Sequence, residues 1–278
     1  MADLVIATFN VHAGVDGWGR PYDVVEACAA LDADVLFLQE NWMPEAGDSI
    51  ACLVGAACGY EVHEARLCDA MIFDPIAQPG RRWGPSRRDH RSGRPLWVTD
   101  SETLGRVRAH RRGEGVRLGA WGIAALFRVP QRRLEIVELG RLSHDNRRLR
   151  AVLVAEVDLD GSPLTVAGTH LAHFMHGSPV LMNKLRRILP GPERPAVLVG
   201  DMNFWGPPVS LALPGWRRAV RARTYASWRP HSQIDHILVT RPVSVISSGA
   251  VHVGRSDHWP VRARLGLAER PRPRRTRM

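Results

Sequence analysis

The feature that most constrains this chain is a set of apolar segments that end in acidic, amide or imidazole side chains. The apolar run 196–199 leads directly into the Gly-Asp-Met-Asn segment 200–203, and the Ser-Asp-His segment 256–258 comes directly before apolar residues. A polar group at the end of a buried strand is costly to desolvate, so it usually binds a metal or transfers protons. Two such clusters in one chain indicate metal-assisted hydrolysis of a phosphoester.

The chain is expected to form one catalytic domain over residues 1–268. Its 278 residues are enough to bury one large core. Polar motifs near both ends, at Asn10 and at His258, can meet in one site only if the segments between them fold together. Residues 269–278 have no core-forming pattern, and we expect them to be a disordered basic tail.

Apolar runs and helical periodicity predict both strands and helices along the chain. Strands are expected at 4–9, 34–39, 70–73, 96–98, 121–127, 134–139, 150–159, 163–169, 196–199, 234–240 and 259–265, and helices at 21–31, 47–58, 178–189 and 207–213. The segment 134–169 has the pattern of a meander, with a hairpin turn at 158–161. Since a meander does not fit a purely parallel sheet, the pattern predicts an α/β protein with two packed sheets flanked by helices.

Positive charge is concentrated in two segments of a chain whose formal net charge is +10. Residues 81–117 hold eleven arginines against four acidic residues, within an Arg-rich surface excursion expected over 75–119. The tail adds five more arginines, so the rest of the chain is close to neutral. Such segments suit a nucleic-acid backbone or an anionic membrane surface. The alternative is a compositional bias toward arginine, because Lys184 is the only lysine.

We expect a monomer, and several features favour the cytoplasm. The first residues lead into an apolar segment without a basic leader, so no signal peptide is expected. No stretch of about 18 apolar residues occurs, so no transmembrane segment is expected either. The four cysteines, at positions 28, 52, 58 and 68, lack the spacing of a zinc site and are expected to stay reduced.

Single polar residues at strand ends are weak indicators when each is taken alone. Glu40 suits Mg²⁺, which prefers oxygen ligands, although a Glu that merely faces solvent is the more common case. Asn10 offers an amide that can orient a phosphate oxygen, a water or a carboxylate, but Asn also ends strands for turn reasons. His170 follows another buried strand, where a structural histidine is the more common interpretation.

Pairs of polar residues are stronger indicators. Asp201 and Asn203 are separated by two along a segment predicted to be extended, so they would share one face and act together on metal and water. The segments 235–236 and 257–258 each place a carboxylate beside an imidazole. A carboxylate bonded to the far nitrogen of a histidine fixes its tautomer and raises its basicity. Both pairs occur after the segment 200–203, and this joint occurrence argues against their being only helix caps or surface residues.

Taken in order, these segments resemble the endonuclease/exonuclease/phosphatase superfamily, which includes apurinic endonucleases, pancreatic-type deoxyribonuclease, neutral sphingomyelinases and inositol polyphosphate 5-phosphatases. The matching stretches are 8–12 (TFNVH), 38–40 (LQE), 121–124 (WGIA), 168–171 (GTHL), 199–203 (VGDMN), 234–237 (IDHI) and 256–258 (SDH). Each is weak alone, and the specific signal is their common order across residues 4–265. The resemblance implies a four-layer α/β/β/α sandwich of two packed mixed sheets flanked by helices.

The resemblance also implies a role for each matching residue. Asn10, Glu40 and Asp257 would lie at a metal ion, Mg²⁺ or Mn²⁺, with Glu40 and Asp257 as direct ligands. The catalytic residues would be His170 and Asn203 at the phosphate, Asp201 at the attacking water, and His258 held by Asp235.

One further carboxylate is implied but not assigned. In deoxyribonuclease-like members, an acidic residue from the region before position 121 pairs with the histidine that matches His170. Glu64 and Asp69 are both candidates, and the sequence does not choose between them.

The expected function is hydrolysis of a phosphoester by in-line attack of an activated water. A nuclease or another phosphodiesterase is favoured, because a basic excursion near the site would suit a polyanion such as nucleic acid. A phospholipid or inositol-phosphate phosphodiesterase or phosphatase is the alternative. A non-catalytic phosphate-binding module of the same fold would have lost some catalytic residue types, and none is lost in the matching segments.

Overall fold

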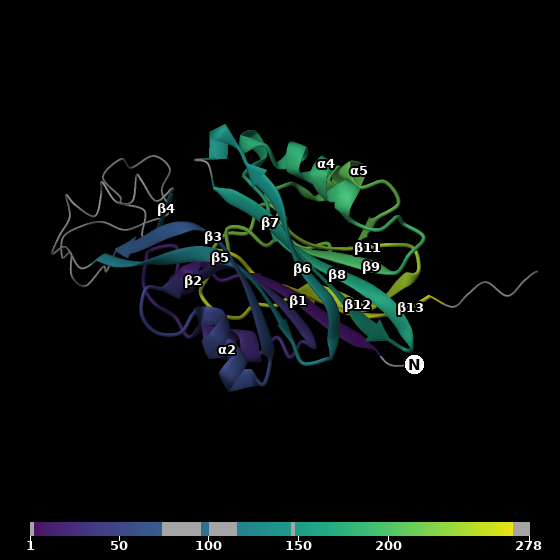
Figure 1. Cartoon of the computed structure of the whole chain (residues 1–278), viewed down its shortest axis with the longest axis horizontal. Coiled ribbons are helices and arrows are strands. Elements are labelled where there is room, and N and C mark those ends of the chain that lie inside the picture. Colours follow the sequence, from purple (N-terminus) through teal and green to yellow (C-terminus); the bar gives the residue numbers. More distant parts are fainter. Residues whose placement is uncertain (1–2, 74–95, 100–115, 146–147, 269–278) are drawn as a thin grey trace, which may run out of the picture.

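Two β-sheets pack against each other, and helices cover their outer faces (Figure 1). The computed structural model describes residues 3–73, 96–99, 116–145 and 148–268. The strands are β1 (Leu4–Asn10), β2 (Val35–Pro44), β3 (Glu61–Phe73), β4 (Leu96–Thr99), β5 (Val116–Phe127), β6 (Gln131–Arg141), β7 (Leu149–Leu159), β8 (Ser162–His170), β9 (Ala196–Asp201), β10 (Arg217–Arg218), β11 (Asp235–Val239), β12 (Val243–Ala250) and β13 (Val261–Leu267). The helices are α1 (Val24–Ala29), α2 (Ile50–Cys58), α4 (Ser178–Ile188) and α5 (Gly206–Ala212), with 3-10 turns η1 (His12–Gly14), η2 (Ser143–Asp145) and η3 (Phe174–His176).

Each sheet contains one pair of parallel strands among antiparallel neighbours. The seven-stranded sheet has the order β12-β13-β1-β2-β5-β3-β4, with β1 and β2 parallel. The six-stranded sheet has the order β10-β11-β9-β8-β7-β6, with β8 and β9 parallel. In these pairs Asn10 lies beside Gln39 and His170 lies beside Asp201. Three of these four residues, Asn10, His170 and Asp201, end their strands, so both parallel pairs bring polar side chains to a strand end.

The main core lies between the two sheets, and a smaller core lies beneath α4 and α5. Side chains such as Phe9 and Phe37 from one sheet and Leu153 from the other belong to the same buried cluster. Leu181 of α4 and Leu198 of β9 belong to the second cluster. In Figure 1, α2 covers the seven-stranded sheet, whereas α4 and α5 cover the six-stranded sheet. The four-layer α/β/β/α sandwich of two mixed sheets is thereby confirmed.

Local signals account for the helices on the outer layers. The Asp23 carboxylate accepts a hydrogen bond from the backbone N–H of Glu26 and caps α1. Ser49 caps α2 in the same way, and Gly59 ends that helix in the left-handed conformation. The helix expected from position 21 begins at Val24, because Asp23 is its cap.

Two strands differ most from the sequence pattern. The pattern predicts only 70–73 of β3 and none of β12. Both strands contain register shifts, between Arg66 and Cys68 in β3 and between Val245 and Ser247 in β12. A bulge interrupts the alternation of apolar and polar side chains, so the strand signal is weakened.

The basic segments are described only in part. The short strand expected at 96–98 is confirmed as β4. Residues 74–95 and 100–115 of the expected excursion, and the tail 269–278, lie outside the described residues. Within the described ranges, no helix is long and apolar enough to cross a membrane. All four cysteines are free thiols, as predicted.

Candidate active site

Polar side chains from both sheets meet where the parallel strand pairs end. Asn10, His170 and Asp201 are the last residues of β1, β8 and β9. Asp235 begins β11 and lies opposite Asp201 in the sheet. The segment 256–258 precedes β13, which pairs with β1. Hydrogen bonds or ion contacts join all eight predicted site residues into one continuous set.

Glu40 reaches the site through a β-bulge in β2. The pairing of β2 with β5 shifts register between Gln39 and Asn41, and Glu40 has a φ of 55°. Gln39 is buried and accepts a hydrogen bond from the Thr8 hydroxyl at 3.0 Å, whereas Glu40 is half-buried. The prediction that the strand ends at Glu40 is wrong, because β2 continues to Pro44. The bulge, rather than a strand end, interrupts the alternation of side chains between the two faces of the sheet at Glu40.

Asn10 connects two of the carboxylates. Its amide nitrogen donates to Asp201 Oδ2 at 3.1 Å and lies 3.4 Å from Glu40 Oε1. Its amide oxygen accepts a hydrogen bond from the backbone N–H of His12 at 3.0 Å. Asn10 therefore holds two acidic groups from different sheets close together.

Asp201 and Asn203 come together through a turn rather than along an extended segment. Asn203 has a φ of 48°, and its backbone N–H donates to Asp201 Oδ1 at 2.9 Å. The prediction of an extended segment is wrong, but both side chains reach His170, at 3.5 Å from Asp201 Oδ2 and 3.2 Å from Asn203 Nδ2. Gly200 precedes the turn with a φ of 136°, and a Cβ there would lie 1.9 Å from the Thr169 carbonyl oxygen. Only glycine permits this close approach of β8 and β9.

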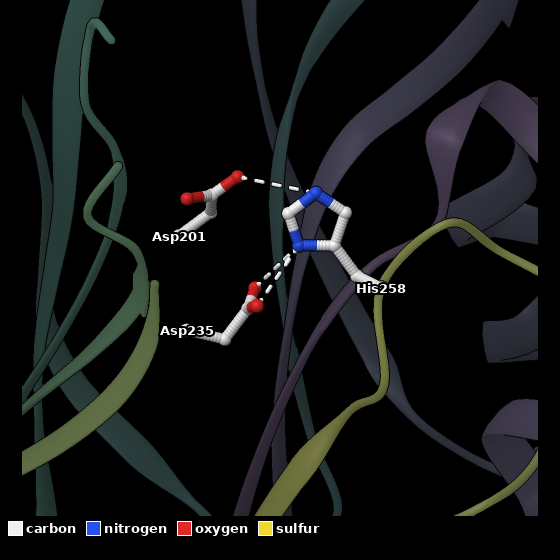
Figure 2. Close-up of side chains that lie close together, drawn as sticks. All are labelled: Asp201, Asp235 and His258. Atoms are coloured by element: carbon white, nitrogen blue, oxygen red, sulfur yellow. Dashed lines mark hydrogen bonds and ion pairs between the residues drawn. The ribbon is translucent and has the colours of Figure 1, made fainter. Parts of the chain in front are cut away.

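Asp235 and His258 form a buried carboxylate–imidazole pair (Figure 2). His258 Nδ1 lies 2.9 Å and 3.1 Å from the two oxygens of Asp235, so Nδ1 carries a proton and donates it to the carboxylate. On the opposite side of the ring, Nε2 lies 3.8 Å from Asp201 Oδ2. His236, adjacent to Asp235 in sequence, instead contacts the Phe204 carbonyl at 2.9 Å and is a structural histidine.

Burial and nearby charge control the protonation of this pair. Burial by itself lowers the pKa of His258, but Asp235, Asp201 and Asp257 outweigh it and hold the pKa well above 6.5. Burial raises the pKa of Asp201 to about 7, although the neighbouring His258 opposes this rise. In the metal-free protein His258 is therefore a cation at neutral pH, and Asp201 titrates there.

His170 is neutral and accepts a hydrogen bond. The Asn203 amide nitrogen donates to the Leu171 carbonyl at 3.1 Å, which fixes the orientation of the amide. The same nitrogen lies 3.2 Å from His170 Nε2, so Nε2 is the acceptor and the ring proton is on Nδ1. Nδ1 is buried without a hydrogen-bond partner among the described residues. Burial, reinforced by the charge of Arg150, lowers the pKa of His170 well below 6.5.

A buried ion pair supports His170. Arg150 Nε lies 2.6 Å from Asp145 Oδ2, and Arg150 Nη1 donates to the His170 carbonyl at 3.1 Å. The Arg150 guanidinium lies 5.1 Å from the centre of the Trp121 ring, and that ring lies 5.0 Å from the ring of His170. Trp121 belongs to one of the matching segments, whereas the sequence did not single out Arg150 or Asp145.

The two candidate carboxylates on β3 have other partners. Glu64 accepts hydrogen bonds from Asn41 and from the Cys52 thiol. Asp69 accepts a hydrogen bond from Arg66 of the same strand. Asn41 in turn accepts a hydrogen bond from the backbone N–H of Ala51 in the first turn of α2. Glu64 therefore binds groups at the start of α2.

Two more residues belong to the site although the sequence did not assign them a role. His12 Nδ1 lies 3.8 Å from Asp257 Oδ1. Burial lowers the pKa of His12, but Asp257 and Glu40 together raise it above its ordinary value. Ser256 donates its hydroxyl to the Asn10 carbonyl at 2.6 Å and so ties the two ends of the chain together. Both lie inside matching segments, which is the signal that could have identified them.

The oxygen donors near His12 fit a hard divalent cation. Glu40 and Asp257 are partly exposed carboxylates that both act on His12, and Asn10 links Glu40 to Asp201. Mg²⁺ and Mn²⁺ prefer such oxygen ligands and keep several waters, so partial exposure suits them.

A second group of possible ligands lies deeper. One ligand atom each from Asp201, Asp235 and His258 lie within 4.8 Å of one another. Both oxygens of Asp235 face the protonated Nδ1 of His258, so this carboxylate serves the imidazole. Asp201 and His258 Nε2 are the groups that remain directed toward the site.

Comparisons with other proteins cover nearly the whole chain. The model described as "Endonuclease/Exonuclease/phosphatase family" matches residues 7–258. A search of curated proteins gives no match. Among solved structures, an endonuclease/exonuclease/phosphatase from Beutenbergia cavernae is 22% identical with a TM-score of 0.64, covering 96% of this chain and 72% of its own.

Two further solved structures share the fold at lower identity. D. rerio TDP2 complexed with a single-strand DNA product is 16% identical with a TM-score of 0.55, covering 96% of this chain and 100% of its own. The mannosyl-6-phosphatase of Bacteroides thetaiotaomicron is 14% identical with a TM-score of 0.55, covering 94% and 99%.

Proposed function

The chain belongs to the endonuclease/exonuclease/phosphatase family, and we propose that it hydrolyses phosphodiesters with the help of Mg²⁺ or Mn²⁺. The observation that carries the proposal is the contact series from Glu40 through Asn10 and Asp201 to His258. This series connects Glu40, which would hold the metal ion, through Asp201, which would act on the attacking water, to a cationic imidazole. Displacement at phosphorus needs both, because charge on the phosphate oxygens must be neutralised while water is held in line.

The metal ion belongs on the side of the seven-stranded sheet. Glu40 and Asp257 would hold it, and Asn10 would fix the Glu40 carboxylate beside it. When bound, the ion supplies positive charge to the phosphate oxygens. His12 Nδ1 contacts the Val15 carbonyl at 3.0 Å and lies 3.8 Å from Asp257 Oδ1, so a protonated His12 would attract this carboxylate without a hydrogen bond to it.

The reacting groups belong on the side of the six-stranded sheet. Asp201, held by Asn10 at 3.1 Å, accepts a hydrogen bond from the attacking water and takes its proton as the new oxygen–phosphorus bond forms. The bond from phosphorus to the leaving oxygen breaks in line, and the departing oxygen takes a proton from solvent water. His258, kept protonated by Asp235, donates its Nε2–H to a phosphate oxygen. His170 and Asn203 form the adjoining wall; to contact a phosphate oxygen, the Asn203 amide would exchange its hydrogen bond to His170 for one to the phosphate.

Nucleic acid is the favoured substrate class. Exposed arginines, including Arg20, Arg229 and Arg255, lie on the loops that lead to the metal side of the site, where a polyanion would pass. The fold similarity to D. rerio TDP2, which is complexed with single-strand DNA, is compatible with this choice. A phosphatase is the second candidate, because the Bacteroides mannosyl-6-phosphatase has the same fold. A phospholipid or an inositol phosphate is a further alternative substrate.

The first test is hydrolysis of bis(4-nitrophenyl) phosphate. We expect turnover with Mg²⁺ and none with EDTA. Asp201→Asn and His258→Ala should each lower kcat by about 10²- to 10⁴-fold, the usual contribution of a positioned acid or base. Asp158→Asn removes an exposed carboxylate on the β7–β8 turn and should keep the parent rate. If both site variants keep the parent rate, the site assignment is wrong.

The second test separates the substrate classes. DNA, RNA, sphingomyelin and inositol phosphates are assayed side by side under the same conditions. We expect the highest kcat/KM for a nucleic acid. Turnover of phosphomonoesters alone would replace the phosphodiesterase proposal with a phosphatase.

A further inference from the structure

Two tryptophans that the proposed chemistry does not use lie against each other beside the site. Trp18 is in the loop after η1, and Trp228 is in the turn at 225–231. Their ring centres are 5.1 Å apart, with the ring planes inclined by 60°. The two residues are 37% and 43% exposed, so a substantial part of both indoles faces solvent. Exposed aromatic surface of this kind often marks a binding site.

The surrounding backbone holds this tryptophan pair in place. The backbone N–H of Trp18 donates to the buried carboxylate of Asp16 at 2.8 Å. Gly17 lies directly on the indole of Trp228, because a Cβ at this position would be 2.7 Å from the ring. The pair is therefore a preformed surface, which binds a ligand without the entropic cost of ordering two free side chains.

The pair is tied to Asp257 from two sides. The backbone N–H of Ser227 donates to the Asp257 carbonyl at 2.8 Å, and its hydroxyl donates to the Ser256 carbonyl at 2.6 Å. Trp228 is the next residue. On the other side, His12 lies 3.8 Å from Asp257 and begins η1, and the loop with Trp18 follows η1. A group bound on the two indoles would lie next to the phosphate that the site holds.

We propose that Trp18 and Trp228 form a stacking platform for an unpaired nucleobase next to the scissile phosphate, an inference that rests on the proposed phosphodiesterase function. Aromatic side chains bind single-stranded nucleic acid by stacking on its bases. The Arg20 guanidinium lies 5.4 Å from the centre of the Trp18 ring but is paired with Asp16 at 2.8 Å, whereas Arg229 is exposed directly after Trp228. Arg229 would contact the phosphate backbone next to the base.

The surroundings of the pair favour a base over a lipid surface. A membrane anchor presents apolar side chains that project freely, whereas both indoles here are partly covered and held by a buried Asp–Gly loop. A base within a duplex is already stacked on its neighbours, so the platform selects single strands or unpaired ends.

The test is equilibrium binding in the Asp201→Asn background with Mg²⁺, measured by fluorescence anisotropy. The probes are labelled hexathymidylate and an abasic hexamer of the same charge. We expect the parent to bind hexathymidylate about 5- to 100-fold more tightly than the abasic strand, the range for stacking when one of the six bases occupies the platform. Trp18→Ala with Trp228→Ala should reduce this preference to nearly 1 and leave the affinity for the abasic strand unchanged.

Three further variants and one measurement complete the design. Trp18→Phe and Trp228→Phe should keep most of the preference, which separates stacking from a folding defect. Ile246→Ala removes an exposed apolar side chain on β12 and should change neither affinity. This position is far from the site, because the adjacent Val245 pairs with Leu265, and Leu265 pairs with Leu4. Leu4 begins β1, whereas Asn10 ends it. Thermal melting of each variant verifies its fold.

Two results would overturn the inference. The first is a parent that does not prefer hexathymidylate. The second is an alanine pair that keeps the full preference; if the parent sediments with phosphatidylserine vesicles and that pair does not, the tryptophans belong to a membrane-binding surface. Failure of the proposed function is distinguishable, because it appears as absent hydrolysis of bis(4-nitrophenyl) phosphate by the wild-type chain.

Discussion

The carboxylates that the two sheets supply to the site differ strongly in burial. On the side of the seven-stranded sheet, the side chains of Asp257 and His12 are 17% and 16% exposed, and Glu40 is half-buried. On the side of the six-stranded sheet, the side chains of Asp201 and Asp235 are only 2% and 1% exposed. His258 follows Asp257 in sequence but is buried with the second group.

This difference in burial separates two tasks that a phosphoester hydrolase must perform. Partly exposed carboxylates can bind a hydrated cation, which keeps several of its waters. Buried groups lack solvent, so their pKa values respond strongly to each other and to burial. We therefore expect changes on the exposed side to alter the need for metal, and changes on the buried side to alter protonation and turnover.

The largest effect should come from Asp235→Asn on the buried side. The substitution keeps the size of the side chain but removes the charge that holds the pKa of His258 high. We expect kcat to fall by about 10²- to 10⁴-fold, as when a triad carboxylate becomes an amide. Saturating Mg²⁺ should not restore it.

The protonation of His258 gives this prediction an independent measurement. NMR titration of the His258 ring in the metal-free protein should show a lower pKa in Asp235→Asn than in the parent. An unchanged pKa would show that the buried carboxylate does not control the imidazole.

A smaller effect is expected from Glu40→Gln on the exposed side. The variant removes a charged oxygen donor, so the Mg²⁺ concentration for half-maximal activity should rise by about 10-fold or more. Excess Mg²⁺ should recover most of the parent rate, in contrast to Asp235→Asn. The measurement is the rate as a function of Mg²⁺ concentration. Equal behaviour of the two variants would remove the distinction between the two sides.

Proton release should report the coupling between the two sides. Burial raises the pKa of Asp201 to about 7 in the metal-free protein. A nearby cation favours the ionised carboxylate, so Mg²⁺ binding should release about one proton at pH 6 and almost none at pH 9. The apparent affinity should therefore rise with pH and level off above the pKa of Asp201.

Calorimetry in buffers of different ionisation enthalpy measures this release. Asp201→Asn cannot ionise at this position and should release fewer protons at pH 6. Proton release that is the same at both pH values in the parent would contradict the assignment of Asp201 to this role.

The smallest effect should come from Ser256→Ala, which tests how the two ends of the chain are joined. The buried hydroxyl donates to the Asn10 carbonyl at 2.6 Å, and its loss should lower the free energy of unfolding by about 1 kcal/mol. Ser248 makes a hydrogen bond of the same length to the Ala219 carbonyl, but it is exposed. Ser248→Ala should cost less than about 0.5 kcal/mol in urea unfolding. Equal costs would show that burial does not set the value of this contact.

The layers of the fold could be predicted to a large extent, and the residues predicted for the site lie together in the structure. Apolar runs predict most of the strands, and polar residues directly after them indicate groups whose burial needs a functional reason. Asp201 and His258 stand out by this criterion, and the common order of the segments adds Asn10, Glu40 and Asp235. The hairpin at 158–161 is confirmed, with the Gly161 N–H bonded to Asp158.

Local backbone details could not be predicted. The bulge at Glu40 and the left-handed conformation of Asn203 both depend on neighbouring strands that the local sequence does not specify. For the same reason β12, an edge strand with a register shift, lacks a clear alternating pattern.

The polar clusters at 200–203 and 256–258 show what the sequence determines and what the tertiary structure determines. The sequence by itself determined which residue types follow the buried strands and in which order, because the cost of burying them is a property of each segment. Only the tertiary structure decided their partners. Asp235 pairs with His258 rather than with the adjacent His236, since neighbouring residues of a strand point to opposite faces. The Trp18–Trp228 pair likewise exists only because two loops from distant parts of the chain meet beside Asp257.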